Sequence, residues 1–198
     1  GGEVMTNLES EVLAAASAAR AASAQLRTLS REVKDSAVIA VADALTANAS
    51  AILEANAVDV SAARARGTDS AIIDRLTLTS GRLADIAVAA REVAQLHDPV
   101  GEVVREYTVP NGLHISQIRV PLGVVAMVYE ARPNVTVDAA VLCLKTGNAA
   151  LLRGSSSAKN TNEALTRVMR AAVEEQGLPA DAIVLVPGDS HEIGRAHV

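Results

Sequence analysis

The stretch GVVAMVYEARPNVTVDAAVLCLKTGNAALLRG, residues 123–154, decides the fold. Its first part, VVAMVY, is a continuous apolar run of the kind found in a parallel strand that is buried on both faces. Pro133 can occupy the first turn of a helix because it needs no hydrogen-bond partner there, and Gly147 stands where that helix should end. AALLR, residues 149–153, predicts a second strand. A strand, a helix and another strand in this order indicate a right-handed crossover and a parallel sheet.

The same alternation continues towards residue 191. After the turn GSSS, Asn160 and Glu163 have the spacing of a helix N-cap and the third helical residue, and apolar residues then recur with helical spacing. AIVLVP, residues 182–187, predicts a third strand. We therefore expect residues 121–191 to form a βαβαβ unit, the beginning of a Rossmann-like α/β sheet.

Residues 1–100 predict a layer of helices in front of this sheet. Apolar residues recur there with helical spacing, and the charged residues alternate as they do on a solvated helix face. One such apolar face is expected to consist of Ile52, Ala55, Val58 and Ala62. We expect no chemistry from this part of the chain.

Residues 101–120 predict a β-hairpin between the helices and the sheet. Apolar and polar residues alternate on both sides of Pro110-Asn111-Gly112. This is a strong turn sequence, because Asn and Gly tolerate positive φ.

The composition narrows the class of protein. The 198 residues carry a net charge of −5 and include two tyrosines but no phenylalanine or tryptophan. A chain with neither a basic surface nor aromatic stacking platforms is not expected to bind nucleic acid. No apolar run approaches the ~20 residues of a membrane span, no charged-then-apolar leader is recognised in the residues given, and the single cysteine gives no sign of an oxidising compartment. We expect a cytoplasmic protein whose core is built from small and branched side chains.

Three polar turns are expected to follow the strands, at residues 130–134, 153–160 and 187–190. The carboxyl ends of parallel strands meet at one edge of the sheet, where open α/β sheets bind ligands. The middle turn offers Arg153 and Lys159 beside small hydroxyl residues, and a guanidinium can hold a phosphate through two hydrogen bonds. This pattern suits a phosphorylated ribose, and it equally suits a polar capping loop.

Other chemistries find no support in the sequence. There is no GxGxxG or GxxxxGK[ST] fingerprint. Cys143 lies inside an expected buried helix, where a thiol acts as a small hydrophobic residue rather than as a nucleophile. No metal-ligand spacing connects the four histidines to other candidate ligands; these are His97, His114, His191 and His197.

The segment RVPLGVVAMVYEARPNVTVDAAVLCLKTGNAALLRGSSSA, residues 119–158, resembles γ-glutamyl phosphate reductase. This is the second enzyme of proline biosynthesis, in the aldehyde dehydrogenase superfamily. LEANAVD, DRLTL, HDPVGE and PNGL stand in the order and spacing of the same family, so the resemblance runs from about Asn7 to Asp189. Two small departures are the GSSS turn, where GGSE is common, and Thr146, where Ser is common.

The resemblance implies a role for each polar turn. In such enzymes the turn after the first strand faces the reacting carbonyl, so Asn134 is the candidate catalytic residue, contacting the developing oxyanion. Glu130 and Arg132 would hold this loop or contact the acidic substrate. The adenosine ribose of the cofactor would be held by Arg153, Gly154, Ser155 and Ser156. Arg153 or Lys159 would meet the 2′-phosphate of NADPH, and the turn beside the cofactor would contain Pro187 and Gly188.

The reaction implied by the resemblance is the NADPH-dependent reduction of L-glutamate 5-phosphate to L-glutamate 5-semialdehyde with release of phosphate. It would pass through a thioester on a cysteine. In the family that cysteine lies further downstream than this chain reaches, so we expect the chain alone to be inactive. The resemblance also implies that the 101–120 ribbon projects from the α/β body and helps to form a homo-oligomer, with an unpaired edge that favours association.

Two alternatives remain open. The chain could be the reductase half of a bifunctional pyrroline-5-carboxylate synthase, which a kinase domain upstream would reveal. It could also be a non-catalytic nucleotide-binding module, which would bind NADPH by itself.

The last seven residues, EIGRAHV at 192–198, depart from the family pattern. The same residues are obtained by translating the start of a common sequencing-library adapter. We therefore expect that they do not belong to the natural protein and exclude them from the fold. Gly1, which stands ahead of Met5, likewise suggests an open 5′ end.

Overall fold

The computed structural model describes residues 7–97, 107–110, 112, 114–115, 118–120, 123–130 and 132–186. Their helices are α1 (Asn7–Leu26), α2 (Arg31–Ala47), α3 (Ala49–Ala65), α4 (Ser70–Leu76), α5 (Ser80–Ala94), α6 (Pro133–Lys145) and α7 (Lys159–Glu175), with short 3-10 turns η1 (Ser156–Ala158) and η2 (Ala180–Ala182). Their strands are β1 (Tyr107–Thr108), β2 (His114–Ile115), β3 (Ile118–Val120), β4 (Val124–Val128), β5 (Ala149–Arg153) and β6 (Ile183–Leu185).

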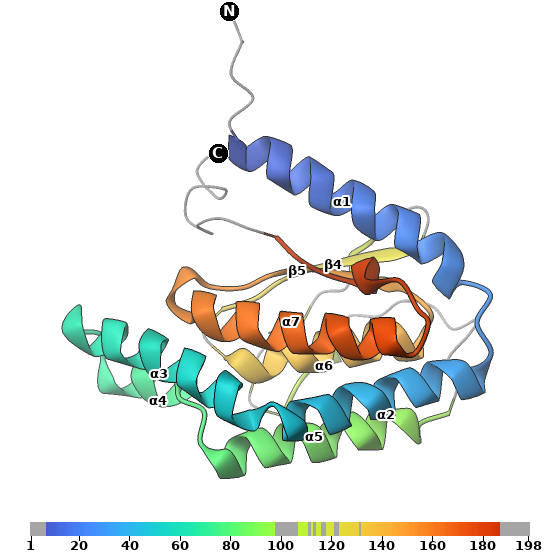
Figure 1. The fold of residues 1–198 in the computed structure, drawn as a ribbon. Coiled ribbons are helices and arrows are strands. Elements are labelled where there is room, and N and C mark those ends of the chain that lie inside the picture. The colour runs from blue at the N-terminus through green and yellow to red at the C-terminus, as the bar shows by residue number, and fades with distance from the viewer. Residues whose placement is uncertain are drawn as a thin grey trace, which may run out of the picture.

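The elements form layers, as Figure 1 shows. Helix α1 packs on one face of the main sheet, α6 and α7 pack on the other, and α2 and α5 form a further layer against α6 and α7. Helix α3 continues this outer layer beside the start of α7. The expected α/β architecture, with helices first and a parallel sheet afterwards, is confirmed.

The main sheet has the strand order β3-β4-β5-β6. Strands β4, β5 and β6 are parallel, with Val124 opposite Ala149 and Ala150 opposite Ile183. Because consecutive parallel strands are neighbours, the crossover helices α6 and α7 both lie on one face of the sheet. The βαβαβ unit predicted from the sequence is therefore present, and its strand carboxyl ends share one edge.

Helix α6 begins and ends as its sequence predicts. Pro133 is its first residue, and Gly147, two residues beyond its end, has a φ of 75°. A left-handed conformation after a helix favours glycine, because other residues meet steric strain there. The segment VLCL makes this helix apolar on most sides, and Val141, Cys143 and Leu144 are buried between the sheet and the outer helices.

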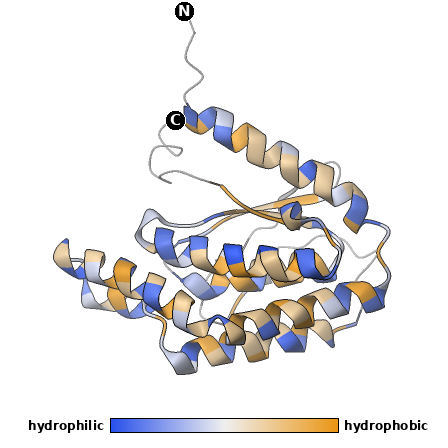
Figure 2. Ribbon diagram, in the orientation of Figure 1, coloured by the Kyte–Doolittle hydropathy of each residue, from blue (hydrophilic) through white to orange (hydrophobic). Residues whose placement is uncertain are grey.

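The core is built from small and branched side chains, as the composition predicts. The buried hydrophobic residues are mainly Ala, Val and Leu, with Tyr129 as the aromatic member among the described residues. In Figure 2 the strands of the main sheet carry the hydrophobic colour, whereas hydrophilic bands recur along the helices. The amphipathic pattern of the helices therefore fits packing against the sheet or against neighbouring helices.

The start of α7 differs from the sequence prediction. The helix begins at Lys159, directly after η1, and its first turn contains Asn160 instead of being capped by it. The backbone N–H groups of Asn160 and Thr161 donate to the carboxylate of Asp59 in α3, at 3.2 and 2.7 Å. The prediction of Asn160 and Glu163 as a local capping pair was wrong, because a residue distant in sequence supplies the cap.

The buried face of α3 also differs from the prediction. Val58 is 53% exposed, whereas Asn56 and Asp59 are only 2% and 4% exposed. Asn56 accepts a hydrogen bond from the Leu78 N–H at 2.8 Å and donates to the Leu76 carbonyl oxygen at 2.9 Å. This face is turned inward because its polar residues bind neighbouring backbone groups, a reason that an apolar pattern cannot reveal.

The region predicted as one hairpin divides between two sheets. Strands β1 and β2 pair in antiparallel fashion, and the Gly112 N–H donates to the Val109 carbonyl oxygen at 3.0 Å, as expected for the turn. Strand β3, however, pairs with β4 at the edge of the main sheet. The prediction that all of 101–120 projects from the α/β body was therefore wrong for 118–120, which satisfies its backbone hydrogen bonds on β4.

Two expectations fall outside the described residues, namely the third polar turn at 187–190 and the tail at 192–198. Among the described residues, no single helix has both the length and the apolar composition to cross a membrane. Helices α2 and α3 reach that length and composition only when they are taken together, and a bend of 69° separates them.

Candidate active site

The turn between β4 and α6 brings polar side chains to the carboxyl edge of the sheet. Arg132 occupies the N-cap position of α6 in an extended conformation, without a capping hydrogen bond from its side chain. Its backbone N–H donates to the Glu130 carbonyl oxygen at 2.7 Å, which tightens the turn. Asn134 follows as the second residue of α6, so its side chain stands at the amino end of a helix and directly beyond a buried strand.

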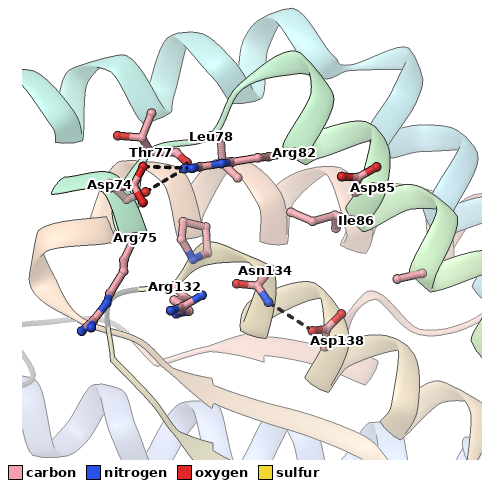
Figure 3. A pocket seen from close by; sticks show the side chains of 12 residues that line it. Asp74, Arg75, Thr77, Leu78, Arg82, Asp85, Ile86, Arg132, Asn134 and Asp138 are labelled. Atoms are coloured by element: carbon pink, nitrogen blue, oxygen red, sulfur yellow. Dashed lines mark hydrogen bonds and ion pairs between the residues drawn. The ribbon is translucent and has the colours of Figure 1, made fainter. Parts of the chain in front are cut away.

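Asn134 lines a pocket of about 400 Å³ between α6 and the segment that joins α4 to α5. Figure 3 shows this pocket, with α6 forming one wall and α4 and α5 the opposite wall. Its lining residues are Asp74, Arg75, Thr77, Leu78, Arg82, Asp85, Ile86, Ala89, Arg132, Pro133, Asn134 and Asp138. A volume of this order is typical of sites for small molecules. The segment DRLTL therefore has a position beside the candidate site that the sequence alone did not assign to it.

Asn134 is oriented within the pocket by its own helix. Its Nδ2 donates to Oδ2 of Asp138, one turn further along α6, at 3.4 Å. Burial raises the pKa of Asp138, and the hydrogen bond from Asn134 acts in the opposite direction. One hydrogen on Nδ2 is thus directed towards Asp138, and the other remains for a group inside the pocket.

Arg82 supports the opposite wall of the pocket. Its guanidinium donates to the carbonyl oxygens of Asp74 and Thr77, at 2.7 and 2.9 Å, and pairs with the Asp74 carboxylate at 2.9 Å. These bonds close the carboxyl end of α4 and neutralise both charges. Arg82 and Asp74 are consequently structural members of the pocket lining.

A buried chain of hydrogen bonds lies behind the turn. The Tyr129 hydroxyl and the Thr136 hydroxyl are 2.6 Å apart, and Thr136 Oγ1 donates to Asn162 Oδ1 at 2.7 Å. Since the single hydroxyl proton of Thr136 is used on Asn162, Tyr129 is the donor to Thr136. Burial raises the pKa of Tyr129, which keeps its hydroxyl protonated. This chain joins the end of β4 to the first turns of α6 and α7.

Gly154 makes this arrangement possible. A Cβ atom at this position would lie 2.3 Å from Nδ2 of Asn162 and 3.2 Å from a ring carbon of Tyr129. Only a residue without a side chain fits here without displacing its neighbours. Tyr129, Thr136 and Asn162 were missed by sequence reasoning, although polar residues inside apolar runs were the available signal.

The turn after β5 keeps the candidate cofactor residues together. Arg153 ends β5, where its carbonyl oxygen accepts from the Tyr129 N–H at 3.1 Å. Ser155 caps η1 by accepting from the Ser157 N–H at 3.2 Å, and the two hydroxyls lie 2.7 Å apart. Ser156 and Lys159 are exposed on the same turn. Arg153, Gly154 and Ser155 are partly exposed and close in sequence to the exposed Ser156 and Lys159, whereas Pro187 and Gly188 lie outside the described residues.

The amino terminus of α7 is already occupied by protein groups. Asp59 accepts the N–H groups of Asn160 and Thr161, together with the Thr161 hydroxyl at 2.6 Å and the Asn160 side-chain amide at 2.9 Å. An anionic ligand near this turn must therefore be held by hydroxyls and cationic side chains rather than by these two N–H groups.

Cys143 and Lys145 have structural positions. Cys143 is 2% exposed, and burial raises the pKa of its thiol to about 12. It is a core residue, as predicted, because a reactive thiol needs a lowered pKa and access. Lys145 is 1% exposed, and its Nζ donates to the Asp35 carboxylate at 2.7 Å and the Ala94 carbonyl oxygen at 3.0 Å. Among the described residues, no group of three His, Cys, Asp or Glu side chains is placed to hold a metal ion.

Comparison with known proteins identifies relatives of this chain. The chain is 56% identical over 188 residues to the γ-glutamyl phosphate reductase of Thermobifida fusca strain YX, covering 95% of this chain and 45% of the relative. It is 52% identical over 186 residues to the γ-glutamyl phosphate reductase of Kineococcus radiotolerans, covering 94% of this chain and 43% of the relative. The resemblance inferred from the sequence is thereby confirmed, and the chain spans a little under half the length of these relatives.

Solved structures show the same likeness. The chain superimposes on γ-glutamyl phosphate reductase from Thermotoga maritima with a TM-score of 0.80 at 38% identity, covering 92% of this chain and 44% of that one. For the enzyme from Saccharomyces cerevisiae the TM-score is 0.73 at 31% identity, with 92% and 47% covered. A glyceraldehyde-3-phosphate dehydrogenase from Methanocaldococcus jannaschii, solved with NADP, shares the fold at 17% identity and a TM-score of 0.64, with 93% and 38% covered.

The model of the aldehyde dehydrogenase family matches residues 2–198, nearly the whole chain. The parallel sheet and the relatives agree with this match. The chain therefore belongs to the aldehyde dehydrogenase family.

Proposed function

We propose that this chain forms the cofactor-side part of an NADPH-dependent reductase that converts L-glutamate 5-phosphate to L-glutamate 5-semialdehyde and phosphate. The names of the relatives at 56% and 52% identity support this substrate. The reaction adds a hydride to the acyl carbon and breaks its bond to the phosphate oxygen. The nucleophile that first forms a thioester is a cysteine outside this chain, since Cys143 is buried with a raised pKa.

The position of Asn134 is the observation that carries the proposal. Its amide stands at the amino end of α6, lines the pocket and retains one N–H beyond the bond to Asp138. A carbonyl that is attacked by a nucleophile develops negative charge on its oxygen. A fixed amide donor stabilises that oxygen more in the transition state than in the ground state.

The turn after β5 fits the adenosine end of NADPH. Residues 153–160 supply one guanidinium, one ammonium group and three serine hydroxyls, and they contain no carboxylate. An acidic residue commonly binds the ribose 2′-hydroxyl of NAD, whereas an arginine accommodates the 2′-phosphate of NADP. When bound, the cofactor supplies the hydride; the role proposed for Arg153 and Lys159 is to hold its phosphate.

The proposal is tested with a chimaera that joins residues 1–191 of this chain to the remainder of the Thermobifida fusca reductase. The assay follows phosphate-dependent reduction of NADP with L-glutamate 5-semialdehyde, the reverse of the proposed reaction. Asn134→Ala should lower kcat by about 10²–10³-fold, because one oxyanion donor is lost. Asn48→Ala, an exposed position at the junction of α2 and α3, serves as the matched control.

Three outcomes separate the possibilities. Activity in the chimaera that depends on Asn134 supports the proposal. A folded chimaera without turnover, together with NADPH binding by residues 1–198 alone, would favour the nucleotide-binding module. An Asn134→Ala variant with full kcat would remove the oxyanion role.

We further propose that the complete enzyme is a cytoplasmic homo-oligomer. The β1–β2 ribbon supports this, because it forms a sheet of its own beside the main one. Light scattering after size-exclusion chromatography of the chimaera tests the oligomeric state, and a monomer at micromolar concentration would contradict it.

A further inference from the structure

The charges that line the Asn134 pocket are not evenly distributed. In Figure 3, the side chains of Arg75 and Arg132 lie towards one end of the pocket, and those of Asp85 and Asp138 lie towards the other. Asn134 stands between Arg132 and Asp138 along the α6 wall. The pocket is therefore cationic at one end and anionic at the other.

The uneven charge of the pocket comes from side chains that are not paired with an opposite charge of the protein. Among the described residues, the charged groups of Arg75, Arg132 and Asp85 form no ion pair, whereas Arg82 and Asp74 neutralise each other. Asp138 accepts one hydrogen bond, from the neutral amide of Asn134, and is half-buried. A half-buried carboxylate without a cation is unfavourable, and a bound cation would relieve that cost.

We infer that Asp138 and Asp85 bind the α-ammonium group of the substrate while Asn134 faces its acyl carbonyl. This inference rests on the proposed function, and it assigns the recognition of the amino-acid end to two carboxylates on α6 and α5. The arginine end of the pocket then suits the acyl phosphate group, whereas the α-carboxylate, bonded to the same carbon as the ammonium group, lies towards the other end. A substrate without an α-ammonium group leaves the carboxylates uncompensated, so the pocket selects against it.

The dimensions agree with this orientation. Asn134 and Asp138 are four residues apart on one helix, which corresponds to about 6 Å along its axis. In a γ-glutamyl group, four single bonds of about 1.5 Å each separate the acyl carbon from the α-nitrogen, and they span about 5 Å when extended. One helical turn and a γ-glutamyl group thus share a length scale at the level of the backbone, whereas the side-chain atoms Asn134 Nδ2 and Asp138 Oδ2 are 3.4 Å apart.

The test compares two aldehydes in the chimaera described above. L-Glutamate 5-semialdehyde carries the α-ammonium group, and 5-oxopentanoate is the same chain without it. Asp138→Asn keeps an acceptor for the Asn134 amide and removes the charge, and Asp85→Asn removes the charge at an exposed position. Each variant should reduce the ratio of kcat/KM between the two aldehydes by roughly ten- to a hundredfold, as expected when one charge-assisted contact is lost.

The controls separate recognition from structure. Asp43→Asn removes an exposed carboxylate on α2, outside this pocket, that pairs with Arg91, so the ratio should stay unchanged. If Asp138→Asn lowers kcat/KM equally for both aldehydes, the residue only supports Asn134, and the inference is overturned. An unsubstituted chimaera that oxidises both aldehydes equally also overturns it. A folded chimaera that oxidises neither contradicts the proposed function itself, and the inference falls with it.

Discussion

Single residues at the carboxyl edge of the sheet divide into those that can contact a ligand and those that hold the backbone. Tyr129, Thr136 and Asn162 belong to the second group, since each is buried and bonded to another of the three. Arg153 ends β5 and Lys159 begins α7, on either side of the turn that this buried chain supports. The polar residues of one motif can thus serve two purposes, and burial distinguishes them.

The cofactor preference is a property of single residues on that turn. Arg153→Ala should raise the KM for NADPH in the chimaera by roughly ten- to a hundredfold and change the KM for NADH much less. A charge-assisted contact to a phosphate contributes about 1.5–3 kcal/mol, and only NADPH carries the 2′-phosphate. Arg167→Ala, on the exposed side of α7, is the control. An equal rise in KM for NADPH and NADH would contradict the assignment of Arg153 to the 2′-phosphate.

At the scale of elements, helix α7 depends on α3 for its first turn. Asp59 is 4% exposed and accepts four hydrogen bonds from Asn160 and Thr161. Asn56 adds a bond from its Nδ2 to the Thr161 hydroxyl at 3.1 Å. The segment LEANAVD therefore joins a helix of the outer layer to the turn that is proposed to hold the cofactor.

Asp59→Ala should lower the free energy of unfolding by roughly 2–4 kcal/mol, because it removes a helix cap and leaves buried donors without an acceptor. Urea titration of the chain measures this change. Asp69→Ala is the matched control, since Asp69 caps the short helix α4 at an exposed position with a 3.4 Å bond. Its expected loss is about 0.5–1 kcal/mol. An equal decrease in the free energy of unfolding in the two variants would show that the buried cap stabilises the chain no more than an exposed one.

The sequence predicts elements better than it predicts their partners. Apolar periodicity placed α6 and β5 correctly, because their burial on both sides leaves continuous apolar runs. It misplaced the buried face of α3. Asn56 and Asp59 are turned inward there because both bind Thr161, which lies more than 100 residues further along the chain. It also joined β3 to the hairpin, because the alternation of a strand does not reveal which neighbour will pair with it. The pocket wall from α4 and α5 could not be predicted, since no local pattern records proximity to α6.

At the scale of the whole molecule, buried groups connect the layers. Lys145 on α6 binds Asp35 on α2 and the carbonyl oxygen of Ala94 at the end of α5. Cys143, two residues earlier, fills the core between the sheet and the same outer helices. Both residues belong to the VLCLK segment, so one turn of α6 fixes the distance between the inner and outer layers.

The stability of the whole chain should fall with pH above about 9 through Cys143. Burial raises the pKa of its thiol from 9.0 to about 12, so between these values the folded chain binds a proton that the unfolded chain has lost. The free energy of unfolding should then decrease by up to about 1.4 kcal/mol per pH unit. Urea titrations at pH 8, 9 and 10 measure this slope, and Cys143→Ala should be flatter over the same range. Parallel curves for the two proteins would contradict the buried-thiol account.

The cap that Asp59 provides for α7 also has a consequence for how the chain folds during synthesis. The bond from the Thr161 N–H to Asp59 closes a loop of 102 residues, and closing such a loop costs about 4 kcal/mol of chain entropy. Ribosomes add ~5–20 residues per second, so α3 exists for several seconds before α7 emerges. During that interval the Asp59 carboxylate has no partner on α7, and water must solvate it. The contact between α3 and α7 therefore forms only after Thr161 has emerged, and a nascent chain paused before Thr161 should keep this face of α3 open to chaperones and proteases.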